Sequence, residues 1–252
     1  MPDFRCSIAS LVDEEPMAGT APTDAEVLLV ESPGPWGREA VGDNRLPEAV
    51  REHLGAMGMK VFLLRRPDGT AGPGTHVFHA RATATGYDVR ATVLDRPEDL
   101  VGLDLAGLAA YDAPLWLVCT NGKRDRCCAE LGRPIAGALA REWPEATWET
   151  THLGGHRFSG TLLSLPSGVT LGRLTPDTAV DACAAVVRGE VPLEWARGRA
   201  GRPAVDQAHE LHVLAGGDPA DELVAVAGPQ RRQSCGDDKV KGTTRFEVRR
   251  PA

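Results

Sequence analysis

Two short stretches of this chain bring together residue types that bind metals. The first contains Cys119 and Cys128 at C-x8-C spacing, and the second contains His152 and His156 at H-x3-H spacing. Two thiolates and two imidazoles form a donor set that can hold zinc or an iron–sulfur cluster. The pattern therefore predicts a metal or redox protein rather than a hydrolase.

The residues around these four side chains are typical of loops that wrap around a metal. The segment between the two cysteines is polar, and its basic Lys123 and Arg124 would offset the negative charge of thiolates. Gly154 and Gly155 separate the two histidines and argue against a helix, so we expect the histidines on a loop that follows a strand. We expect the ligands to be surrounded by Lys123, Arg124, Gly154, Gly155 and Arg157.

The remaining cysteines leave several interpretations open. Cys127 and Cys128 are adjacent, so either thiol could be the ligand and the other would then be a core residue or a spare ligand. Cys235 lies in a polar turn near the C-terminus and could approach the site if the tail folds back. Cys6 and Cys183 are expected to take no part.

Composition narrows the class of protein. The chain has 252 residues, of which 42% are hydrophobic and 25% charged, which is ordinary for a globular protein with a core. Its net charge of −7 argues against nucleic acid as a partner, because phosphate binding needs a basic face. No apolar run approaches the roughly 20 residues that span a bilayer, so no membrane association is expected. The N-terminus does not resemble a signal peptide, and the adjacent cysteines favour a reducing, cytoplasmic location.

Apolar runs and turn signals predict the order β-α-β-β-β-α twice along the chain. In the first half we expect these elements at residues 27–30, 46–57, 61–64, 76–84, 87–94 and 97–108. In the second half we expect them at residues 115–118, 128–143, 146–151, 161–165, 169–174 and 178–188. The order predicts an α/β protein with two related thioredoxin-like halves, although α/β proteins also show such orders by chance.

Three regions follow from this interpretation. Residues 1–110 would form an N-terminal thioredoxin-like half without cluster ligands, preceded by an irregular arm at residues 1–22. Residues 111–190 would form the half with the ligands. Residues 191–252 would form a C-terminal extension packed on the core.

The Cys loop and the His-Leu-Gly-Gly-His segment resemble the sucrase/ferredoxin-like family. Residues 15–22, 29–37 and 163–168 carry the same resemblance, which extends from the N-terminal arm to about residue 175. Members of that family are similar to thioredoxin-like ferredoxins, with a 2Fe–2S cluster held by two cysteines and two histidines. The resemblance implies a thioredoxin-like ferredoxin fold, and matching the Arg-Asp pair of the loop without a gap implies that Cys128 rather than Cys127 is the second thiolate.

The resemblance also shapes the expected function. It implies an electron carrier or redox sensor rather than a catalyst, with a protein as redox partner and with electron transfer coupled to a proton on an imidazole ligand. Sucrose cleavage is implied by the family name alone, because no carboxylate pair typical of a glycosidase is found. Two alternatives remain: a zinc protein with Cys2His2 ligation, and a thiol redox enzyme with Cys127 or Cys128 as its nucleophile.

Overall fold

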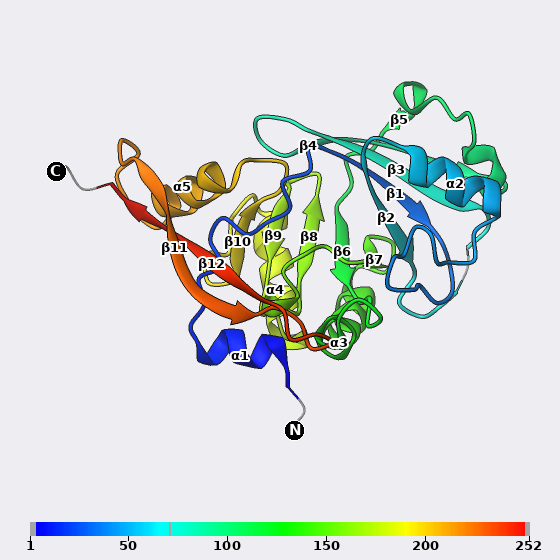
Figure 1. Ribbon diagram of the computed structural model, residues 1–252. Helices are drawn as coiled ribbons and strands as arrows, with labels where there is room; N and C mark the ends of the chain where they lie inside the picture. The colour runs from blue at the N-terminus through cyan, green and yellow to red at the C-terminus, as the bar shows by residue number, and fades with distance from the viewer. Residues whose placement is uncertain (1–3, 71, 250–252) are drawn as a thin grey trace.

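A single curled sheet of ten strands forms the scaffold of the protein (Figure 1). The computed structural model describes residues 4–70 and 72–249. The strand order across the sheet is β10-β9-β8-β6-β7-β2-β1-β3-β4-β5. This mixed α/β architecture confirms the predicted fold class and is consistent with a thioredoxin-like ferredoxin fold.

The first half of the chain forms a four-stranded unit. Its strand β1 is parallel to β2 on one side and antiparallel to β3 on the other, and β3 pairs with β4 in antiparallel fashion. One helix, α2, covers one face through Val50 and Leu54, which pack on alternate residues of β1. The elements are β1 (Glu26–Glu31), α2 (Glu48–Ala56), β2 (Lys60–Arg65), β3 (Thr75–Ala82) and β4 (Tyr87–Leu94).

The second half repeats this arrangement. Strand β6 is parallel to β7 and antiparallel to β8, which pairs with β9. Strands β7 and β2 pair in antiparallel fashion and join the two units, while β5 (Ala109–Ala110) and β10 (Ala196–Arg199) extend the outer edges. The elements are β6 (Leu115–Cys119), α3 (Arg126–Glu142), β7 (Thr147–Thr150), β8 (Leu162–Leu165), β9 (Val169–Leu171) and α4 (Pro176–Val187).

The matching strand order and directions support the interpretation of two related halves. Because one sheet runs unbroken through both halves, the division into domains near residues 110 and 190 stays a prediction. Alternation along β6 divides the core between two faces of the sheet. Trp116 and Val118 pack with α3 and α4, whereas Leu115, Leu117 and Cys119 pack with residues of the first unit. The side chain of Cys119, the last residue of β6, therefore lies on the face of the sheet that packs against the first unit.

Segments from the N-terminal and C-terminal regions of the chain meet at the start of α3. Helix α1 (Cys6–Val12) lies beside the short 3-10 helix η3 (His156–Phe158). Helix α5 (Ala204–Leu214) leads into a separate two-stranded sheet of β11 (Leu223–Arg232) and β12 (Val240–Val248). The loop that connects these two strands reaches the N-terminus of α3 (Figure 1). Segments more than 200 residues apart in sequence therefore meet beside the Cys loop.

Two expectations were wrong in detail. The helix predicted at residues 97–108 is replaced by two 3-10 turns, η1 (Pro97–Leu100) and η2 (Leu105–Gly107), with Gly102 between them at φ +88°. A left-handed glycine cannot continue an α-helix, so the segment breaks there. The N-terminal arm contains α1 within residues 4–22, where only irregular chain was expected. Within the described residues, no helix is both long and apolar enough to span a membrane.

Candidate metal centre

The Cys loop connects β6 to α3 and is fixed by short-range hydrogen bonds. The backbone N–H of Arg124 donates to the side-chain oxygen of Asn121 at 3.2 Å, which forms a tight turn. Asp125 caps α3, because its carboxylate accepts from the backbone N–H of Cys127 at 3.0 Å. Cys127 and Cys128 are then consecutive residues in the first turn of a helix, where side chains point about 100° apart. The two thiols therefore face different surroundings.

Cys119, Cys128 and His152 meet at one point. Their ligand atoms all lie within 4.8 Å of one another. The Nδ1 atom of His152 is 3.8 Å from the Sγ of Cys119 and 3.7 Å from the Sγ of Cys128. Both cysteines are buried, and His152 is partly exposed. The hydrogen bond from Cys128, helped by His152, lowers the pKa of Cys119 well below its usual value, and the same bond raises the pKa of Cys128.

His156 joins this group through His152 rather than through the thiols. Its Nδ1 lies 3.2 Å from the Nε2 of His152, and its Nε2 lies 2.6 Å from the carbonyl oxygen of Gln233. A carbonyl oxygen only accepts hydrogen bonds, so the Nε2 of His156 carries the proton. Its Nδ1 is then unprotonated and can bind a metal. Burial lowers the pKa of His156 and favours the neutral ring that binds metals. No sequence motif pointed to Gln233, which lies on the C-terminal hairpin.

Both glycines of the His loop adopt left-handed backbone conformations. Gly154 has φ +81° and Gly155 has φ +68°, a region that favours glycine. A Cβ at Gly155 would in addition overlap the guanidinium of Arg197. The two glycines allow the chain to turn back within three residues, which places both imidazoles on the same side of the loop.

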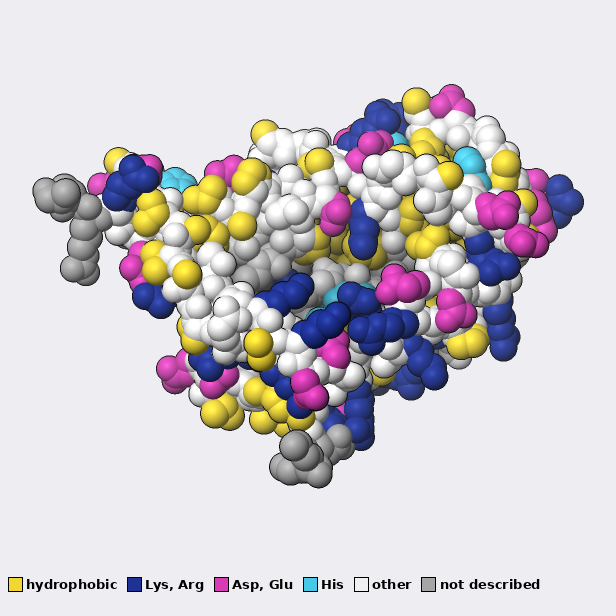
Figure 2. Space-filling view, viewed as in Figure 1, with side chains coloured by type: hydrophobic (Ala, Val, Ile, Leu, Met, Phe, Trp, Pro, Cys, Tyr) yellow, Lys and Arg dark blue, Asp and Glu magenta, His cyan; other side chains and the backbone are white. Residues whose placement is uncertain are grey.

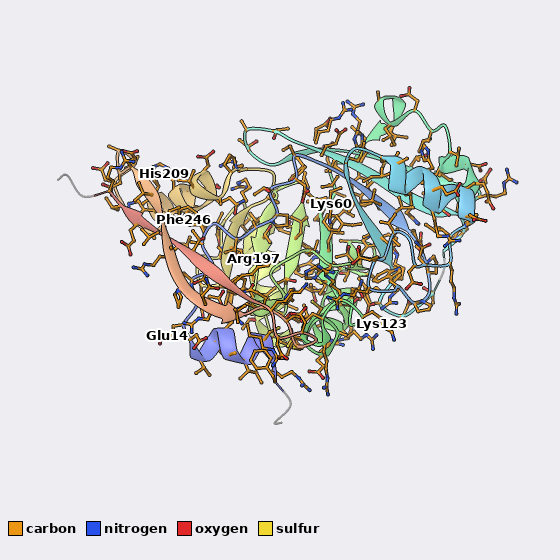
Figure 3. The ribbon with its side chains drawn as sticks, in the orientation of Figure 1. Glu14, Lys60, Lys123, Arg197, His209 and Phe246 are labelled. Atoms are coloured by element: carbon orange, nitrogen blue, oxygen red, sulfur yellow. The ribbon has the colours of Figure 1, made fainter. Side chains whose placement is uncertain are left out.

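Arg197 is a buried cation close to the thiols that the sequence analysis did not single out. It projects from β10 into the interior of the second unit, with 1% of its surface exposed (Figure 3). Its guanidinium donates to the carbonyl oxygens of Gly154 and Thr20. Burial lowers its pKa to about 10, and the thiols of Cys119 and Cys128 act in the opposite direction. A pKa of about 10 keeps Arg197 charged near neutral pH, and its positive charge favours thiolates nearby.

The other basic residues expected around the ligands have different partners. Lys123 is exposed on the turn, and Arg124 pairs with Glu39 at 3.1 Å. Arg157 is buried and pairs with Glu15 at 2.6 Å, and its guanidinium also donates to the carbonyl oxygen of Arg232. Arg157 therefore ties η3 to the N-terminal arm and to the C-terminal hairpin.

Cys127 and Cys235 do not face this Cys/His group (Cys119, Cys128, His152 and His156). They belong to a second group, in which their Sγ atoms are 3.3 Å apart and Cys6 lies 3.5 Å from Cys235. Cys6, which was expected to take no part, is brought by α1 to the start of α3 and lies in this second group. The hydrogen bond from Cys6 lowers the pKa of Cys127 to about 5. Cys183 lies in α4 and is buried in the core, away from both groups.

The Cys/His group passes a simple test of fit to a metal. Bonds of about 2.3 Å to sulfur and 2.0–2.1 Å to nitrogen at a tetrahedral ion place these atoms about 3.6 Å apart. The observed separations of 3.7 and 3.8 Å are close to that value. The thiol pair and the imidazole pair also lie side by side. This arrangement suits a 2Fe–2S cluster in which the two cysteines bind one iron and the two histidines bind the other.

The fold and the site thus define an α/β protein whose Cys and His side chains can hold a metal. A profile of the sucrase/ferredoxin-like family matches residues 17–198, most of the chain, and the protein belongs to that family. This confirms the resemblance carried by the Cys and His motifs. No curated protein and no solved structure gives a significant match.

Proposed function

We propose that the protein is a 2Fe–2S electron carrier whose cluster is held by Cys119, Cys128, His152 and His156. The observation that supports this function is the convergence of two buried thiols and a pair of touching imidazoles at adjacent strand ends. Family membership supports the same assignment, since the family name includes ferredoxins. A bound cluster would supply one-electron transfer, and neutral histidine ligands raise its reduction potential above that of an all-cysteine cluster.

The protein would hold and shield such a cluster with its own residues. The carbonyl of Gln233 orients His156 by holding its Nε2 proton. Arg197 places a positive charge in the interior near the thiols, which offsets part of their negative charge. The two thiols are 1% exposed, so water has little access to the sulfur side, while the partly exposed imidazoles face the surface.

A zinc site is the second candidate, and one observation favours it. The imidazole of His152 lies within 3.8 Å of both sulfurs, a distance that suits one tetrahedral ion. Zinc has no visible absorption, so colour separates the two candidates.

The decisive experiment is the absorption spectrum of protein purified without air, together with iron and sulfide analysis. The cluster predicts bands between about 320 and 550 nm and about two irons and two acid-labile sulfides per chain. A colourless protein without sulfide overturns the proposal. Zinc at the Cys/His group would then establish the second candidate, whereas no metal there would leave a thiol enzyme.

The partner that we propose for electron exchange is an acidic redox protein. A pocket of about 350 Å³ opens beside His152 and is lined by four basic side chains and one acidic one. The basic residues are Arg38, Arg51, Lys60 and Arg124. Figure 2 shows Lys and Arg side chains gathered beside a histidine near the centre of this face. Such a field attracts anions to the partly exposed imidazole.

A charge reversal tests this surface with ferricyanide as the anionic probe. The double variant Arg51→Glu/Lys60→Glu is expected to slow oxidation of the reduced protein about tenfold at low ionic strength. The difference should shrink in high salt, because exposed charges are then screened. Arg141→Glu, an exposed change at the last turn of α3, is the matched control and should keep the wild-type rate. Equal rates for both variants would exclude steering by this pocket.

A further inference from the structure

Three thiols from distant parts of the chain meet beside the first turn of α3. We name the group of Cys6, Cys127 and Cys235 the thiol cluster. Cys6 begins α1, Cys127 lies in the first turn of α3, and Cys235 follows β11. Their sulfurs and a carboxylate oxygen of Asp125 all lie within 4.8 Å of one another. Cys6 and Cys127 are buried and Cys235 is partly exposed.

The spacing of these atoms is that of ligands about a single ion. The Sγ of Cys235 is 3.3 Å from the Sγ of Cys127 and 3.5 Å from the Sγ of Cys6, and Cys6 is 3.4 Å from an oxygen of Asp125. Bonds of about 2.3 Å to a tetrahedral zinc place two sulfurs about 3.8 Å apart. Small side-chain rotations would therefore bring all four atoms into range of one ion.

Neighbouring groups donate hydrogen bonds to two of the three sulfurs. The backbone N–H of Cys6 donates to the Sγ of Cys235 at 3.3 Å, and the hydroxyl of Ser7 donates to the Sγ of Cys127 at 3.1 Å. Sulfur is a weak acceptor as a thiol and a strong one as a thiolate, which is also the form that binds metals. A disulfide would use only two of the three sulfurs and would leave the third outside the bond.

We propose that the thiol cluster, completed by the carboxylate of Asp125, binds a zinc ion. Zinc matches this donor set because it is soft enough for thiolates and accepts a carboxylate as fourth ligand. The site is separate from the Cys/His group, because Cys127 and Cys128 point to different sides of α3. The proposal is also independent of the proposed electron carrier, since it uses none of that group's four residues.

Such an ion would fasten both ends of the chain to the candidate centre. It would join α1 and the C-terminal hairpin to α3, which closes loops of more than 100 residues. Asp125 already accepts from the hydroxyl of Ser234 at 3.0 Å and from the backbone N–H of Cys235 at 2.9 Å. Gln233, whose carbonyl holds His156, lies two residues before Cys235. The zinc ion would therefore add to the contacts through Asp125 that already hold this hairpin beside His156.

Metal counting on purified protein tests the proposal. Zinc and iron per chain would be measured in the wild type, in Cys6→Ser and Cys235→Ser, and in Cys183→Ala as the control for loss of a buried thiol. We expect one zinc per wild-type chain besides any metal in the Cys/His group, the loss of this one zinc in both serine variants, and no loss in the control. Zinc content that does not change in the serine variants contradicts the proposal. A zinc-free protein that is 2 Da lighter, with a Cys127–Cys235 disulfide, contradicts it as well.

X-ray absorption at the zinc edge keeps the test decisive if a serine variant fails to fold. In a wild-type protein with one zinc, three sulfurs and one lighter ligand per zinc are expected. Two sulfurs and two nitrogens would instead place the zinc in the Cys/His group and overturn the proposal. If the wild type holds two zincs, the average must be two and a half sulfurs per zinc, and a lower count overturns it. The iron content decides the electron-carrier proposal separately.

Discussion

Cys128→Ser is expected to abolish the visible absorption and the iron content of the protein, whereas Cys127→Ser at the neighbouring position should leave both unchanged. The reason is the direction of two consecutive helical side chains. The Sγ of Cys128 lies 3.7 Å from the Nδ1 of His152, while that of Cys127 lies 3.3 Å from the Sγ of Cys235. Serine keeps the size of the side chain and removes the soft ligand, so each variant tests one thiol.

The spectrum and the iron and sulfide contents of the two variants would be compared after identical purification without air. Far-ultraviolet circular dichroism would verify that both are folded. The Cys127→Ser protein is expected to lose zinc while it keeps its colour. Loss of colour in Cys127→Ser with retention in Cys128→Ser would reverse the assignment and place the cluster at the thiol cluster.

The sequence predicted the parts of the site that depend on local pattern. Cys119 ends a run of apolar residues, and Gly154 and Gly155 exclude a helix between the histidines, so both loops could be placed at strand ends. The parallel pairing of β6 and β7 then brings the two loops together, because the ends of parallel strands lie at one edge of a sheet. Two repeated β-α-β-β-β patterns were likewise enough to predict the α/β class and the order of elements along the chain.

The missed residues depend on contacts between distant segments. Cys6 and Gln233 reach the site only because the N-terminal arm and the C-terminal hairpin fold back over the start of α3. The spacing of apolar residues along the chain does not predict contacts between segments so far apart in sequence. Arg197 is buried because the His loop and the N-terminal arm fold over it, where its guanidinium donates to the carbonyl oxygens of Gly154 and Thr20. The wrong prediction of a helix at residues 97–108 has a local cause. The spacing of apolar residues favoured a helix, although Gly102 is a residue that commonly interrupts one.

Gly132→Ala is expected to lower the free energy of unfolding by about 1–3 kcal/mol, because it overpacks the contact between α3 and β6. A Cβ at Gly132 would overlap the carbonyl oxygen of Cys119 and would lie 3.2 Å from the Cγ2 of Thr120. Strand β6 is paired on both sides, by β7 and β8, so it cannot move away. The helix must shift instead, and it carries Cys128 away from Cys119. We therefore expect a lower iron content together with the lower stability.

Gly137→Ala is the matched control in the same helix. No atom lies within 4 Å of a Cβ at Gly137, so this change should raise the free energy of unfolding by about 0.5–1 kcal/mol through helix propensity alone. Urea denaturation of both variants would measure the two effects, and iron analysis would relate them to the site. Equal stability and full iron in both variants would show that α3 can slide on β6 without cost. A destabilised Gly132→Ala protein with full iron would instead show that the loop after Cys119, rather than the packing of the helix, sets the distance between the two thiols.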